Sequence, residues 1–62
     1  MKGIWSFNAT EEVVGLIPTI ANDVGMEFIV AFKAHWSFYT YDVFLEGTRE
    51  QFLEVIDRLN QI

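Results

Sequence analysis

The chain of 62 residues has no cysteine, one histidine, one proline and only four basic residues. Without cysteine it cannot be a disulfide-stapled miniprotein, a zinc finger, an iron–sulfur protein or a thiol enzyme. His35 is the only imidazole, and no glycine-containing cluster of carboxylates resembles a calcium loop, so we expect no metal and no cofactor. No run approaches the roughly 20 apolar residues of a spanning helix, and the opening residues are not typical of a signal peptide. We therefore expect a cytoplasmic protein without a membrane segment.

Nine acidic residues against the four basic ones give a formal charge of −5, which disfavours binding to nucleic acid phosphates. Hydrophobic residues make up 52% of the chain and aromatic residues 16%, so a folded domain spanning 1–62 is expected rather than disorder. A chain of about 60 residues buries only about 60% of its unfolded surface. Because disulfides and metals are excluded, its stability has to come from a good core and from self-association.

Three segments carry the residue types and the alternation of β-strands, at 2–8, at 26–34 and within 36–45. In the first strand we expect Trp5 and Phe7 to face the core. In the second, Phe28, Val30 and Phe32 fall on one face and Ile29 and Ala31 on the other, so both faces are apolar. The third strand is apolar on both faces as well, which indicates that the second face of the sheet is also covered.

Two segments show apolar residues at helical spacing. The first begins among residues 8–12, where Asn8 or Thr10 can cap it, and ends at Gly25. Pro18 lies inside this pattern and predicts a kink near Ile17, because proline removes a helical hydrogen bond. The second helix begins at Thr48, which forms a capping box with Gln51. The apolar positions are Val13, Leu16, Ile17, Ile20 and Val24 in the first helix and Phe52, Val55, Ile56, Leu59 and Ile62 in the second.

The order β-α-β-β-α predicts an α+β fold of ferredoxin-like type, with two helices on one face of a three-stranded antiparallel sheet and without the usual fourth strand. The crossover rule places the first strand beside the third. The outer edge of the first strand is then unpaired, and the open face carries an apolar patch, which predicts a homodimer or a higher homo-oligomer. The predicted interface residues are Ile4, Ile29, Ala31, Phe38 and Phe44.

Catalytic chemistry is not expected. His35 and Ser37 lie two residues apart on one strand face, but no third orienting group and no glycine-rich oxyanion turn accompany them. An alternative is binding of single-stranded RNA, because the aromatic strands are similar to those of RNA-recognition motifs, with Trp5, Trp36 and Phe38 as stacking candidates. The glycines, the basic residues and the fourth strand of that family are missing here.

The run YDVFLEGTREQFLEVIDRLNQ at 41–61 resembles the last strand–helix step of ACT domains and is similar to the NIL domain of methionine-importer ATPases. The resemblance implies a regulatory module that dimerises through its sheet and binds an amino acid or similar small molecule near the turn after the first strand. That turn corresponds to Asn8, Ala9 and Thr10. It lacks the glycine usual in ACT domains, and helix capping explains Asn8 and Thr10 as well. A further alternative is a protein-interaction module or inhibitor that adds its sheet edge to a partner.

Overall fold

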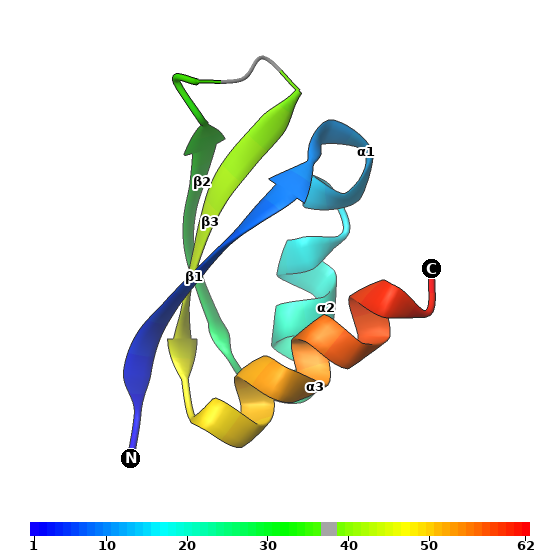
Figure 1. Cartoon of the computed structure of the whole chain (residues 1–62). Helices are drawn as coiled ribbons and strands as arrows, with labels where there is room; N and C mark the ends of the chain where they lie inside the picture. The colour runs from blue at the N-terminus through cyan, green and yellow to red at the C-terminus, as the bar shows by residue number, and fades with distance from the viewer. Residues whose placement is uncertain (37–38) are drawn as a thin grey trace.

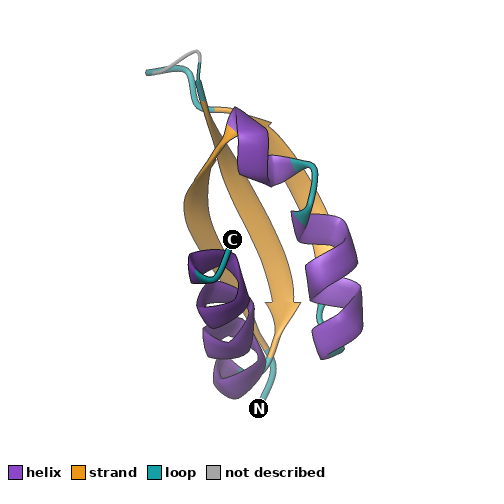
Figure 2. Cartoon of the chain, turned by 90° about the vertical axis from the view of Figure 1, so that its right-hand side faces the viewer, coloured by secondary structure: helices purple, strands orange, loops and turns teal. Residues whose placement is uncertain are grey.

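The computed structural model describes residues 1–36 and 39–62 as an α+β fold. Its elements are β1 (Gly3–Thr10), α1 (Glu11–Val14), α2 (Ile17–Val24), β2 (Glu27–Lys33), β3 (Thr40–Gly47) and α3 (Arg49–Asn60). The strands form an antiparallel sheet of order β1-β3-β2. The predicted neighbourhood of the first and third strands is therefore confirmed. The helices lie on one side of the sheet (Figure 1), and the view turned by 90° shows them in front of the strands (Figure 2).

The first helical segment consists of two helices where the sequence predicted one. Gly15 and Leu16 separate α1 from α2, and Pro18 occupies the first turn of α2. The missing amide hydrogen of proline costs little in a first turn, because amides there have no partner within the helix. The predicted irregularity near Ile17 is thus a break just before that residue. The Thr10 side chain makes no capping hydrogen bond to α1, although Thr10 lies at the N-cap position.

The core lies between the sheet and the helices. Its buried cluster contains Ala9, Ile17, Ala21, Met26, Val43, Leu45 and Val55. Trp5 and Phe7 face the helices, as predicted, and both pack on Phe52 of α3. The Trp5 ring stacks on Phe52 with ring centroids 5.1 Å apart, and its indole Nε1 donates to the carbonyl oxygen of Gly47 at 3.0 Å. These contacts fasten β1 to the start of α3.

A β-bulge in β2 overturns the predicted faces of that strand. Phe28 is opposite Leu45, but Val30 is opposite the adjacent Phe44, so Ile29 is an extra residue. Because one inserted residue reverses the alternation beyond it, Phe28 and Ala31 both pack against the core cluster. The prediction that Ala31 lies on the open face is therefore wrong.

The bulge places Val30 and Phe32 on the open face, where both are exposed. The Phe32 ring stacks on Phe44 of β3, with centroids 5.6 Å apart and planes inclined by 21°. Phe38, which was also predicted for this face, lies outside the described residues.

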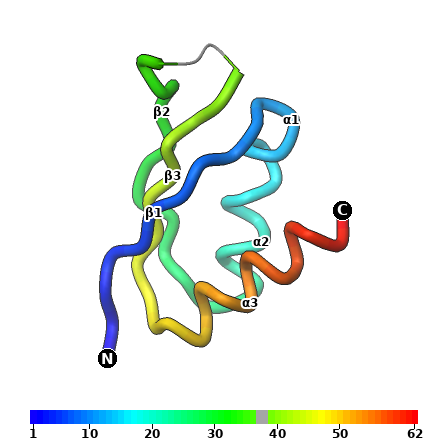
Figure 3. Tube along the Cα trace, in the orientation of Figure 1, coloured from blue at the N-terminus to red at the C-terminus, as the bar shows by residue number. Residues whose placement is uncertain are grey.

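The capping box at the start of α3 is present as predicted. The backbone N–H of Gln51 donates to Thr48 Oγ1 at 3.2 Å, and the backbone N–H of Thr48 donates to Gln51 Oε1 at 2.8 Å. Gln51 Nε2 also donates to the carbonyl oxygen of Gly25 at 3.3 Å, across to the end of α2. Gly25 ends α2 with φ 94°, the left-handed conformation that glycine adopts without strain. The trace shows α3 starting beside the α2–β2 connection (Figure 3).

Among the helices of the described residues, none has the length and apolar character needed to cross a membrane.

Candidate functional site

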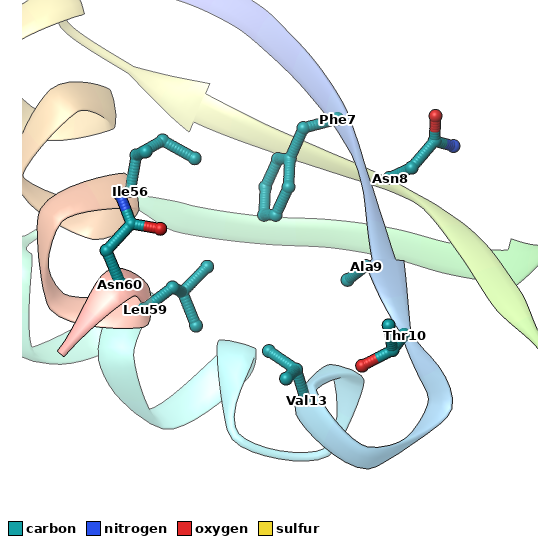
Figure 4. A pocket seen from close by; sticks show the side chains of 8 residues that line it. All are labelled: Phe7, Asn8, Ala9, Thr10, Val13, Ile56, Leu59 and Asn60. Atoms are coloured by element: carbon teal, nitrogen blue, oxygen red, sulfur yellow. The ribbon is translucent and has the colours of Figure 1, made fainter. Parts of the chain in front are cut away.

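A groove of about 270 Å³ lies between the end of β1, the start of α1 and the C-terminal half of α3. Phe7 and Ala9 point into it from β1, Val13 from α1, and Ile56 and Leu59 from α3 (Figure 4). The other lining residues are Asn8, Thr10 and Asn60. No lining residue is charged, so the groove suits an uncharged, largely apolar group.

The three residues predicted to bind a ligand, Asn8, Ala9 and Thr10, all line this groove. Of the three, Ala9 is the one whose side chain points into the groove (Figure 4). The Asn8 side chain points away from the groove (Figure 4) and donates from Nδ2 to Asp42 Oδ1 on the neighbouring strand. The Thr10 hydroxyl lies at the rim near Val13 (Figure 4). The capping alternative fails for Thr10, which makes no side-chain cap, while Asn8 belongs to the strand.

Sequence reasoning missed the α3 wall of the groove. Ile56 and Leu59 were assigned to the apolar stripe that covers the sheet, and Asn60 carried no signal at all. One available signal was the small side chain of Ala9 beside the large side chain of Phe7. A small residue at this point of a strand leaves room between the sheet and the helix that crosses it.

A second hollow, of about 330 Å³, lies where β1 ends and β3 begins. It is lined by Thr10, Glu11, Glu12, Tyr39 and Thr40. The backbone amide of Glu11 donates to the carbonyl oxygen of Tyr39 at 3.0 Å and thereby holds its two sides together. Its two carboxylates give it a negative lining, in contrast to the uncharged groove.

The open face of the sheet carries part of the predicted interface. Ile4 is 58% exposed, Ile29 is exposed at the bulge, and Phe44 is half-buried beneath Phe32. Acidic residues lie beside these apolar ones, since Glu46 is the partner of Ile4 and Asp42 is the partner of Phe32 in the strand register. The apolar centre of this face therefore has carboxylates on either side along β3.

The two edges of the sheet differ in composition. β1 pairs only with β3 within the described residues, and its eight residues include no charged residue and no proline. β2 forms the other edge and carries the bulge as well as Glu27 and Lys33. Bulges and charges are the features by which natural sheets discourage pairing at an edge, so β1 is the unprotected one.

The described members of the sets considered for catalysis, metal binding or RNA binding lie in different parts of the fold. No group of three or more metal-binding side chains occurs among residues 1–36 and 39–62. His35 is exposed in the turn after β2, and Ser37 lies outside the described residues. Trp36 is exposed in the same turn, whereas Trp5 faces the helices on Phe52. Trp5 and Trp36 thus do not form a common stacking surface, and Phe38 lies outside the described residues.

No family model, curated protein or solved structure matches this chain.

Proposed function

We propose that this domain is a self-associating regulatory module of ferredoxin-like type that senses a small molecule and has no catalytic activity of its own. The strand order β1-β3-β2 with the helices on one side is compatible with a ferredoxin-like sheet lacking its last strand. The resemblance of the segment 41–61 to ACT and NIL domains supports a regulatory role. His35 is the one side chain of the sequence whose usual pKa suits general acid–base catalysis near neutral pH, and no second such group accompanies it. This composition supports binding rather than catalysis.

The groove between β1 and α3 is the observation that carries the sensing function. Ligand sites are concave, mostly apolar and fixed by a few polar groups, and typical volumes begin at roughly 300 Å³. The groove is of about that size, and its polar groups are the Thr10 hydroxyl and the Asn60 amide. Because none of its lining residues carries a charge that could form an ion pair with an ammonium or carboxylate, a bound amino acid places its apolar side chain in the groove and its charged end toward solvent.

A thermal-shift series tests the sensing function. Leucine, isoleucine, methionine and phenylalanine should raise the melting temperature saturably, whereas glutamate and lysine should not. A ligand at 100 times its Kd adds about 2.7 kcal/mol to the free energy of unfolding, which is readily measured for a small domain. The absence of a shift with every apolar amino acid would contradict the amino-acid assignment.

A variant that fills the groove supplies the matched control. Asn60→Trp places a large ring at an exposed position of α3 that lines the groove, so it should abolish the ligand-induced shift. Leu53→Trp places the same ring at an exposed position of α3 outside the groove and should leave the shift unchanged. Equal shifts in the two variants would place the ligand elsewhere.

The uncovered edge of β1 supports a second candidate function, a protein-interaction module that accepts a strand of a different protein. The two candidates predict different behaviour of the purified chain. A regulatory homo-oligomer sediments above the mass of the 7.2 kDa chain at micromolar concentration, and a module awaiting a different protein sediments as a monomer.

A further inference from the structure

We infer that a second copy of this chain pairs with the free edge of β1 through its own β1, antiparallel and about a two-fold axis at Ser6, so that the two sheets join into one of six strands. This inference rests on the proposed self-association and names the surface and the register that would produce it.

The choice of β1 follows from the contrast between the two edges. The register of β1 with β3 is continuous from Gly3 to Thr10, so the strand offers an unbroken row of backbone groups to a neighbour. No charge or proline along these eight residues opposes an added strand. In β2 the extra residue Ile29 interrupts the register, and Lys33 ends the strand with a charge.

The charges at the ends of β1 favour a second copy as the partner. Lys2 precedes the strand, and Glu11 and Glu12 follow it, while the strand between them is uncharged. Two identical strands that run antiparallel bring the basic end of each beside the acidic end of the other. Although the net charge of −5 opposes association in general, this edge is electrostatically complementary to itself.

The position of the axis follows from strand geometry. Residues directly opposite in an antiparallel pair point to the same face. If both copies keep their helices on the same side of the joined sheet, the residue at the axis must lie directly opposite its own counterpart in the second copy. An axis placed between two successive residues would put the two sets of helices on opposite sides. Near-complete overlap of Gly3–Thr10 then allows only Ser6 or Phe7 as the centre.

Ser6 is the better centre. Its small exposed side chain lies on the open face, whereas Phe7 is packed beneath α3 against Phe52, with centroids 5.8 Å apart. With the axis at Ser6, Ile4 is opposite Asn8 of the second copy. Lys2 is then opposite the Thr10 position, which directly precedes Glu11.

Disulfide mapping tests this register, because the chain contains no cysteine of its own. Directly opposite residues have Cα atoms about 4.5–5.5 Å apart, within the range of about 4.4–6.8 Å that a disulfide spans. Under mild oxidation Ser6→Cys should cross-link with itself, and a mixture of Ile4→Cys with Asn8→Cys should form the mixed dimer. Val30→Cys, which is exposed on β2, serves as the control and should stay uncross-linked.

The outcomes separate this inference from the proposed function. A mixed dimer of Ser6→Cys with Asn8→Cys, without self-cross-linking of Ser6→Cys, would place the axis at Phe7 and overturn the register. A wild-type dimer in sedimentation with no cross-link at any β1 position would overturn the use of this edge but leave self-association intact. A wild-type monomer at micromolar concentration would overturn both.

A pair of charge variants tests the same contact without cross-linking. Ser6→Lys places two ammonium groups opposite each other at the axis and should weaken the dimer roughly tenfold at low salt, with recovery at high salt. Ser6→Gln has a similar length and no charge and should leave the dimer intact. Because Ser6 is exposed, both variants should keep the melting behaviour of the isolated domain, and equal dimer affinity in the two would contradict the inference.

Discussion

Substitution of Gly47 by alanine should destabilise the domain strongly, because three elements meet at this glycine. A Cβ atom at position 47 would lie 2.6 Å from Gln51 Oε1 and 3.0 Å from the Cγ and Cε atoms of Met26. The first distance is far too short for any real contact, so the Gln51 side chain would have to move. Met26 is buried, so its side chain can move away only by repacking against the core.

The magnitude follows from what Gln51 gives up when it moves. Its Oε1 accepts from Thr48 N at 2.8 Å and its Nε2 donates to the Gly25 carbonyl at 3.3 Å. Two such hydrogen bonds contribute about 1 kcal/mol each, and overpacking against a buried side chain adds about 1 kcal/mol or more. We therefore expect Gly47→Ala to cost about 2–4 kcal/mol, a large part of the total stability of a small domain.

A double-mutant cycle measured by urea unfolding at one fixed protein concentration tests this reasoning, with the fluorescence of the two tryptophans as the signal. Gln51→Ala alone should cost about 1–2 kcal/mol through loss of the capping box. The double variant should cost about 1–2 kcal/mol less than the sum of the single ones, because the clashing side chain and its hydrogen bonds are already gone. Strict additivity, or a cost of Gly47→Ala below about 0.5 kcal/mol, would refute the proposed clash.

Two further pairs of substitutions test the backbone and the core by the same unfolding measurement. Gly25→Ala should cost about 1 kcal/mol or more because φ is 94° there, whereas Gly15→Ala should be neutral or stabilising by up to about 1 kcal/mol, since its φ is −67° and nothing lies within 4 Å. Equal effects of the two would contradict the conformational argument. Ile17→Ala should cost about 2–5 kcal/mol because Ile17 is 0% exposed, whereas Ile62→Ala, at a position 69% exposed, should change the free energy of unfolding by less than about 0.5 kcal/mol. A comparable loss at Ile62 would show that the end of the chain is packed after all.

The features that the sequence predicted well are those with a local chemical cause. The capping box of Thr48 and Gln51 and the stop at Gly25 each depend on residues within one helical turn. The placement of Trp5 and Phe7 toward the core depends on simple alternation in a short strand. The strand order follows from connection lengths and handedness, which need no knowledge of side-chain contacts.

The features that escaped prediction are those for which two local structures fit the same residues about equally well. In the middle of β2 the residues at odd and at even positions are both apolar, so each face of the strand looks equally suited to the core. The alternation of residue types therefore could not locate the extra residue Ile29. Pro18 signalled an irregularity, but its tolerance in a first helical turn moved the break to Gly15 and Leu16.

The candidate site likewise contains residues that the sequence pointed to and residues that it did not. Asn8, Ala9 and Thr10 were chosen by resemblance, and they form one wall of the groove. The opposite wall, formed by Ile56 and Leu59, comes from a helix far away in the chain, and its apolar residues match the pattern of ordinary core packing. The direction of the Asn8 side chain depends on its partner Asp42 across β3, which no local pattern specifies.

The bulge at Ile29 also bears on how far an assembly built on this sheet can grow. A sheet with two receptive edges can recruit copies at both ends and lengthen into a fibre, as stacked strands do in amyloid. Within the described residues β1 is the edge without a bulge or a charge. If two copies pair there as we propose, β1 is covered in both copies and β2 forms the two outer edges of the joined sheet. In such a dimer the inserted residue Ile29 would discourage further strands from adding at β2, and the assembly would stop at two copies.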